Sequence, residues 1–204
     1  MEAGNGRGET RSPLLVPHIV VDHISFVDPD FLLRIGKRCA LIDLDNTLLA
    51  WGAEELDAQV CAWVQGALAA GIRICVLSNS RSYRVAWYAL QLGVPYVGVA
   101  LKPGRAAARG AMQLIGSCVE DTVIIGDQIF TDILLGRRLG LYTILVRPMA
   151  MREQFWMRMV RVVERLFWPA PEGEESVTMG RARIFLRALL APKRKEASTV
   201  SSGQ

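Results

Sequence analysis

The chain has 204 residues, a formal net charge of +4, and a composition that is 51% hydrophobic and 22% charged. This length suits one domain with a small addition, and this composition excludes a largely disordered chain. No apolar run reaches the roughly 18–20 residues that span a bilayer, and the polar start lacks the apolar core of a secretory signal. We therefore expect a cytoplasmic protein, and the mild positive charge is compatible with anionic partners.

The four cysteines are widely separated, and no two of them form a CxxC pair. This spacing favours free thiols in a reducing compartment over a disulfide framework or a structural zinc site. We therefore expect Cys39, Cys61, Cys75 and Cys118 to be small buried residues.

The start of the chain predicts a disordered segment, an irregular lead-in and one buried strand. Residues 1–12 are polar and rich in glycine, which is typical of disorder. Residues 13–36 carry short apolar runs broken by prolines, so we expect an irregular segment with a short helix near residues 31–35. Residues 39–43 form an apolar run that ends in a carboxylate, which indicates a buried parallel strand.

Beyond this strand, apolar runs alternate with segments of helix length. Strands are predicted over residues 72–78, 96–100, 122–126 and 142–146, and helices over residues 53–70, 81–92, 104–115 and 131–139. In the first of these helices we expect Glu54, Glu55 and Asp57 in the first turn, where the helix dipole favours negative charge. The alternation predicts an α/β fold, with a central parallel sheet and helices on both faces.

Four carboxylates follow two of the predicted strands. Asp43 and Asp45 stand at the end of the first strand, and Asp127 and Asp132 follow the strand at residues 122–126. Reactive groups in parallel sheets lie just past the carboxyl ends of the strands, so these side chains are expected to meet at one edge. Carboxylates held close together repel one another unless a cation joins them or one of them is protonated. Hard oxygen ligands of this kind favour Mg²⁺ over zinc.

Groups that suit phosphate follow two further strands. Ser78 and Asn79 stand immediately before a predicted helix, where a hydroxyl and free backbone N–H groups bind anions well. Lys102 follows the strand at residues 96–100 and supplies a cation. Each of these residues alone would be ordinary in a loop. The ordered set, with a metal-binding or phosphate-binding group after each of four strands, predicts a site for phosphate chemistry.

This ordered set resembles the haloacid dehalogenase (HAD) phosphohydrolases, with the motifs DLDNT at residues 43–47, Ser78, Lys102 and GDQIFTD at residues 126–132. The longer strings DLDNTLLAW, VLSNS, LKPG and GDQIFTDILLGRRLGLYTILVRP are similar to the YqeG-type branch of subfamily IIIA. That branch resembles the mitochondrial and plastid phosphatidylglycerophosphate phosphatases. Ser80 departs from the pattern, which has a second Asn there, and we expect it to alter hydrogen bonding around the site and not the chemistry.

The resemblance implies a Rossmann-like HAD fold and a reaction that depends on Mg²⁺. Asp43 would attack phosphorus and form an aspartyl-phosphate. Asp45 would protonate the leaving oxygen and then take a proton from the hydrolytic water. Asp43, the backbone carbonyl of Asp45, and Asp127 would hold the Mg²⁺ ion, which neutralises charge on the phosphoryl group.

The resemblance also implies a set of phosphate-binding residues around the nucleophile. Ser78 and Lys102 would bind the phosphoryl oxygens, and Lys102 would offset charge in the transition state. Thr47 and Asn79 would support this set. Asp132 would act through metal-bound water or by orienting Lys102.

Many members of this superfamily carry a cap domain, inserted between the first and second motifs or between the second and third. Here the intervals 45–78 and 78–102 each have room for one helix and one strand. We therefore expect no cap domain, and a site that can admit bulky or surface-bound substrates.

The C-terminal part of the chain is basic and has a helical period in its apolar residues. Residues 151–168 predict a basic amphipathic helix with Arg158, Arg161 and Arg165 in one stripe, and residues 169–204 predict a linker and a basic tail. The helix could pack on the sheet, or it could attach the protein to the inner face of an anionic membrane without spanning it. Base-stacking motifs are absent from the sequence, so we expect no nucleic-acid partner.

Residues 13–150 are thus predicted to form a HAD phosphatase core. The leading hypothesis is a Mg²⁺-dependent phosphomonoester hydrolase that uses an aspartyl-phosphate and acts on phosphatidylglycerophosphate or a similar lipid phosphate. A phosphatase of a soluble sugar phosphate or nucleotide is one alternative, and a non-catalytic binding or scaffold protein is another. The intact Asp43, Asp45, Lys102 and Asp127 argue against a non-catalytic protein.

Overall fold

A computed structural model of the chain describes residues 14–149. The predicted disordered start, the basic amphipathic helix at residues 151–168 and the tail at residues 169–204 lie outside this described range. Among residues 14–149, no helix is both long and apolar enough to cross a bilayer.

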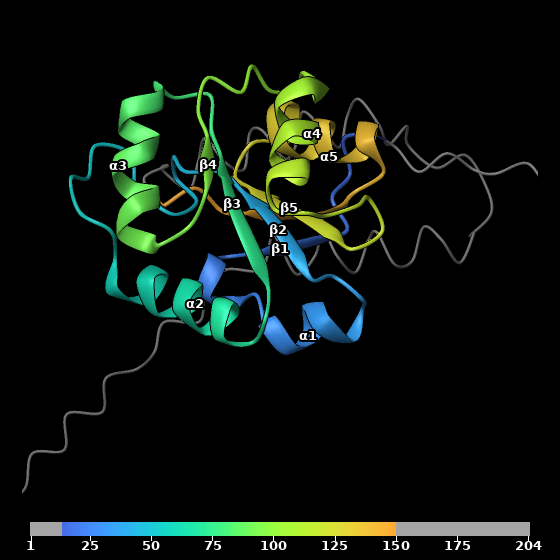
Figure 1. Ribbon diagram of the computed structural model, residues 1–204, viewed down its shortest axis with the longest axis horizontal. Helices are drawn as coiled ribbons and strands as arrows, with labels where there is room; N and C mark the ends of the chain where they lie inside the picture. Colours follow the sequence, from blue (N-terminus) through green and yellow to red (C-terminus); the bar gives the residue numbers. More distant parts are fainter. Residues whose placement is uncertain (1–13, 150–204) are drawn as a thin grey trace, which may run out of the picture. The chain divides into compact units, whose positions relative to one another are not determined.

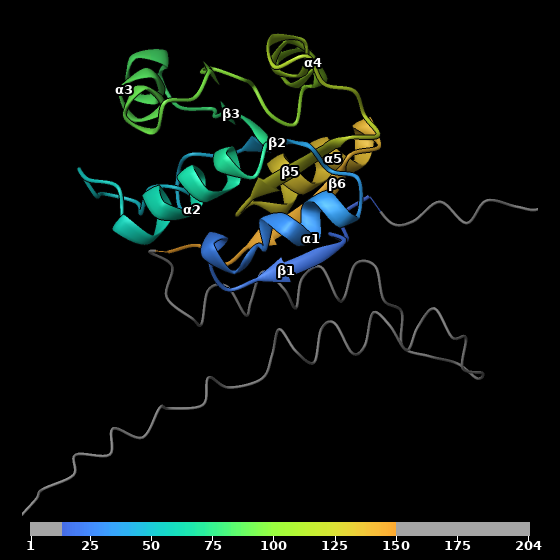
Figure 2. The ribbon, with the colours of Figure 1, turned by 60° about the horizontal axis from the view of Figure 1, so that its bottom comes forward.

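The described residues fold around one six-stranded sheet, in which every pair of neighbouring strands is parallel (Figure 1). The strand order is β1-β6-β5-β2-β3-β4, so β5 and β2 lie in the centre and β1 lies at one edge (Figure 2). The strands are β1 (Ile19–Val21), β2 (Cys39–Ile42), β3 (Arg73–Leu77), β4 (Tyr96–Val97), β5 (Thr122–Gly126) and β6 (Tyr142–Val146).

Helices cover both faces of this sheet. The described helices are α1 (Pro29–Arg34), α2 (Ala58–Ala69), α3 (Ser82–Leu92), α4 (Arg105–Leu114) and α5 (Leu134–Leu139), with the short turns η1 (Ile24–Phe26) and η2 (Ile129–Ile133). Side chains of α1, α2 and α3 pack on one face, and side chains of α4 and α5 pack on the other. Successive residues of a strand point to opposite faces, so Ala40 and Ile42 of β2 join the first core while Cys39 and Leu41 join the second.

The predicted fold class is confirmed, including the absence of a cap domain. In the described part of the chain, α2 is the one helix between β2 and β3, and α3 is the one helix between β3 and β4. The cysteines are free, as expected, although Cys118 is exposed and only Cys39 and Cys75 are fully buried.

The lead-in is more regular than predicted, because residues 19–21 form the edge strand β1. This strand pairs with β6 in the register Ile19↔Ile144. The ring Nδ1 of His18 accepts a hydrogen bond from the backbone N–H of Thr143 at 3.0 Å, which extends the pairing. A strand of three residues whose partner lies more than a hundred positions away leaves little local signal in the sequence. The short helix predicted near residues 31–35 is present as α1.

The start of α2 differs from the prediction, which placed it at residue 53. The helix begins at Ala58, because the side chain of Asp57 caps it by accepting the N–H of Gln59 at 2.7 Å. Glu54 and Glu55 therefore precede the helix and do not lie in its first turn.

Two elements near the predicted site also differ from the prediction. β4 ends at Val97 and does not extend to residue 100, since the chain turns away at Val99, where φ is +51°. The helix predicted over residues 131–139 begins as the π-type turn η2 and continues as α5.

Candidate active site

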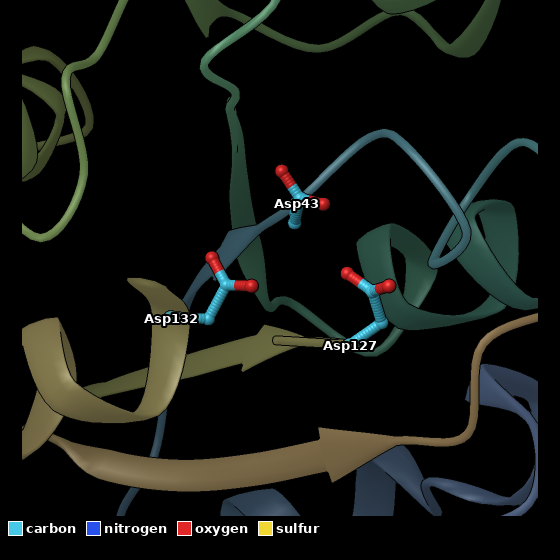
Figure 3. A group of neighbouring side chains, drawn as sticks. All are labelled: Asp43, Asp127 and Asp132. Carbon is cyan, nitrogen blue, oxygen red and sulfur yellow. The ribbon is translucent and has the colours of Figure 1, made fainter. Parts of the chain in front are cut away.

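The central strands bring three of the predicted carboxylates together. β2 and β5 pair in the register Ile42↔Ile125, so Asp43 and Asp127 emerge side by side at the carboxyl ends of the two strands. Asp43 continues the pairing by donating its N–H to the carbonyl of Ile125 at 2.9 Å. Asp132 reaches the same place from η2 (Figure 3). Carboxylate oxygens of the three buried aspartates lie within 4.8 Å of one another.

Gly126 makes this close approach possible. A Cβ atom at this position would collide with the carboxyl group of Asp132. Any other residue at position 126 would therefore push Asp132 away from Asp43 and Asp127.

Lys102 supplies a cation to this carboxylate group. Its ammonium lies 2.6 Å from Oδ1 of Asp43 and 2.6 Å from Oδ1 of Asp132, and its side chain is 3% exposed. Burial by itself lowers the pKa of an ammonium, but the carboxylates of Asp132 and Asp43 outweigh burial and raise the pKa of Lys102 above its ordinary value. Lys102 therefore stays charged, and it lies between the predicted nucleophile and Asp132.

One ammonium does not balance three buried carboxylates. Burial, together with the nearby Asp43 and Asp132 carboxylates, raises the pKa of Asp127 to about 8. Burial also raises the pKa of Asp43 to about 7, although Lys102 opposes the shift. Oδ1 of Asp127 is buried and has no hydrogen-bond partner among the described residues. Excess negative charge and hard oxygen donors in this group of three aspartates fit a divalent cation.

The other predicted phosphate-binding residues make different contacts. Ser78 is buried at the end of β3, and its Oγ accepts the N–H of Ser80 at 3.1 Å. Asn79 holds the backbone of Lys102, because its Oδ1 accepts the Lys102 N–H at 2.7 Å and its Nδ2 donates to the Lys102 carbonyl at 3.2 Å. Oγ1 of Thr47 is buried without a hydrogen-bond partner in the described range. Asn79 thus positions the loop that carries Lys102, and its part in binding phosphate stays a prediction.

Asp45, the predicted acid and base, has two side-chain partners, and the sequence analysis singled out only one of them, Ser80. Its Oδ1 lies 2.5 Å from Nη1 of Arg84, and its Oδ2 accepts a hydrogen bond from the hydroxyl of Ser80. Its carboxylate is not part of the group of three aspartates described above. Arg84 belongs to no motif, and its place in the first turn of α3, right after the Ser78 motif, is the one signal that could have marked it.

Comparisons with known proteins show the family of the chain. A family model described as HAD-hydrolase-like matches residues 99–150. The chain is 35% identical to the probable phosphatase YqeG of Bacillus subtilis, over 74% of this chain and 87% of that protein. It is 27% identical to phosphatidylglycerophosphate phosphatase 1, chloroplastic/mitochondrial, of Arabidopsis thaliana, over 74% of this chain. That match spans only 46% of the Arabidopsis protein.

Among solved structures, the chain is similar to the cobalt-bound deoxy-D-mannose-octulosonate 8-phosphate phosphatase of Haemophilus influenzae. It is 18% identical and has a TM-score of 0.45, over 75% of this chain and 89% of that chain. A likeness at this level supports no statement about activity. The similarity to YqeG establishes the family of this chain. The chain belongs to the HAD-like phosphatase family, in the branch that contains YqeG.

Proposed function

We propose that this chain is a Mg²⁺-dependent phosphomonoester hydrolase that works through an aspartyl-phosphate on Asp43. The observation that carries the proposal is the 2.6 Å contact between Asp43 and the ammonium of Lys102, inside a buried group with two more carboxylates. A carboxylate held by a lysine and next to a cation-binding group suits attack on a phosphoryl group, because positive charge then offsets the charge of the transition state.

In the proposed reaction, an oxygen of Asp43 attacks phosphorus while the bond from phosphorus to the alcohol oxygen breaks, and an aspartyl-phosphate forms. Asp45 gives its proton to the departing alcohol oxygen. It then takes a proton from the water that attacks phosphorus while the bond from phosphorus to the Asp43 oxygen breaks, so that free phosphate leaves and both aspartates return to their starting states. Ser78 and Lys102 bind the phosphoryl oxygens. Mg²⁺, held by Asp43, Asp127 and the backbone carbonyl of Asp45, would neutralise phosphoryl charge.

For the substrate, we propose phosphatidylglycerophosphate or a similar lipid phosphomonoester. The name of the Arabidopsis relative supports a lipid of this class. The loops that follow the site-bearing strands support it too, because they carry exposed apolar side chains. Trp51 follows β2 and is 70% exposed, Leu101 precedes Lys102 and is 75% exposed, and Phe130 lies in η2 and is 47% exposed. Exposed apolar side chains around a site favour a substrate with an apolar part, or one presented at a surface.

The loop that carries Lys102 has a strained backbone, which accompanies the exposure of Leu101. Val99 and Leu101 both have φ of +51°, a left-handed conformation that is costly for residues with branched or bulky side chains. Two hydrogen bonds hold the strained loop against the end of β3, from the N–H of Val99 to the Ser80 carbonyl and from the N–H of Ala100 to the Ser78 carbonyl, both at 3.0 Å. The result is a loop that buries Lys102 while it exposes Leu101.

A phosphate-release screen tests the substrate proposal. Phosphatidylglycerophosphate in mixed micelles would be compared with glycerol 3-phosphate, a hexose phosphate and a nucleotide, and we expect the highest kcat/KM for the lipid. Leu101→Asn should lower kcat/KM for the lipid and spare the soluble esters, since Asn tolerates the left-handed conformation. Leu114→Asn, at the exposed end of α4, is the matched control.

Each result of the screen separates the candidate functions. A clear preference for a soluble ester would refute the lipid proposal and favour the soluble-substrate phosphatase. Absence of phosphate release from every ester, with Mg²⁺ present, would favour a non-catalytic binding protein. Contact of the predicted basic helix with an anionic membrane stays a separate prediction.

A further inference from the structure

We infer that Arg84 and Ser80 are positioning residues, which hold the carboxylate of Asp45 ready to give and take a proton at the reacting oxygens. This inference rests on the proposed function, because it requires Asp45 to be the general acid and base. Neither residue belongs to the set of catalytic and phosphate-binding groups that the sequence indicated.

The side chains of Asp45, Ser80 and Arg84 contact one another pairwise. Nη1 of Arg84 lies 2.5 Å from Oδ1 of Asp45, the hydroxyl of Ser80 donates to Oδ2, and Nη1 of Arg84 also lies 3.4 Å from the Ser80 oxygen. Both oxygens of the carboxylate thus have a donor. The carboxylate therefore cannot rotate freely about its bond to Cβ without breaking one of these contacts.

The two donors are themselves held in place. The guanidinium of Arg84 lies 5.7 Å from the ring centroid of Tyr88, and the buried Tyr88 donates its hydroxyl to the Glu54 carbonyl at 3.0 Å. The backbone N–H of Ser80 donates to Oγ of Ser78. The side chains of Arg84 and Asp45 are 30% and 12% exposed, so this ion pair is more restrained than a typical surface pair.

There is a physical reason for Asp45 to have a cationic partner other than Lys102. Asp43, Asp127 and Asp132 lie within 4.8 Å of one another, and the carboxylate of Asp45 would add to their mutual repulsion if it lay among them. Arg84 gives Asp45 its own cation, outside the group of three. The Ser80–Arg84 pair thereby separates the carboxylate that would transfer protons from those that would bind the phosphoryl group and a cation.

A comparison of two aryl phosphates tests the inference. The p-nitrophenolate ion leaves readily without a proton, whereas the more basic phenolate of phenyl phosphate depends on the general acid. Arg84→Ala should lower kcat/KM for phenyl phosphate by about 100-fold, the cost of a misplaced catalytic group, and should change kcat/KM for p-nitrophenyl phosphate far less. Arg84→Lys should recover part of the loss. Arg81→Ala, at the exposed N-cap of α3, is the matched control and should leave both substrates unaffected.

Asp45→Asn serves as the reference variant, because it distinguishes failure of this inference from failure of the proposed acid role of Asp45. If Asp45→Asn shows the leaving-group effect but Arg84→Ala lowers kcat/KM for both substrates equally, or for neither, the inference is overturned and the proposed function stands. If Asp45→Asn shows no leaving-group effect, the acid role of Asp45 is wrong, and with it the inference. Thermal unfolding checks that Arg84→Ala folds, and if it does not, Ser80→Ala removes one contact with a smaller change and decides the outcome by the same ratio.

Discussion

Replacing Lys102 by Met would remove the ammonium from the site while keeping most of the volume of the side chain. The change leaves Asp43 and Asp132 without the donor that now lies 2.6 Å from each of them, in a place where all three side chains are at most 6% exposed. Removing one partner from a buried ion pair costs about 3–5 kcal/mol, because the remaining charge stays buried and unpaired. For a domain of this size, that corresponds to a fall in the unfolding midpoint of roughly 6–20 °C.

The assay is thermal unfolding followed by circular dichroism, at pH 9 and in the presence of EDTA. Lys37→Met is the matched control, because the Lys37 ammonium donates to a surface carbonyl and should affect the midpoint little. At pH 5 the deficit of Lys102→Met should shrink. The pKa of Asp43 is about 7 and that of Asp127 about 8 with Lys102 in place, and loss of the ammonium raises both, so at pH 5 these carboxyls are neutral.

The same variant should also lose turnover. By analogy with the loss of one oxyanion donor, the cost in transition-state stabilisation is roughly 3 kcal/mol. Equal midpoints for Lys102→Met and the wild type at pH 9 without divalent cations would contradict the electrostatic account of this site. A deficit that is identical at pH 5 and pH 9 would indicate lost packing and not lost charge.

Three further predictions concern the carboxylates. Asp43→Asn should abolish phosphate release and keep a cooperative unfolding transition, and substantial residual turnover would disprove the role of Asp43 as nucleophile. EDTA should remove activity and Mg²⁺ should restore it, and Asp127→Ala should raise the Mg²⁺ concentration needed for half-maximal rate. Full activity of metal-free protein would exclude Mg²⁺ as a cofactor. Metal-free protein should lose stability in thermal scans as pH rises from about 4 towards about 8. The pKa of Asp127 in the folded state is about 8, above its ordinary value of 3.8, so in this pH range the folded state binds a proton that the unfolded state releases. Mg²⁺ should reverse that loss at pH 8, and a flat profile without metal would count against the buried cluster.

The fold class was predictable from the sequence because it depends on local patterns. Apolar runs alternate with helix-length segments, and parallel strands then require helices on both faces. The same topology places the carboxyl ends of the strands at one edge, so the meeting of Asp43, Ser78, Lys102 and Asp127 at that edge follows from their positions along the chain. The start of α2 was less predictable, because Asp57 acts as a cap and the acidic residues before it do not extend the helix.

Only the tertiary structure decided which of these groups contact one another. Lys102 contacts Asp43 and Asp132, Asn79 holds the backbone of Lys102, and Arg84 holds Asp45. These choices depend on side-chain rotation and on the packing of loops whose residues are 23 to 59 positions apart. The pairing of β1 with β6 also depends on the tertiary structure, because the three residues of β1 carry too little pattern to specify a strand by themselves.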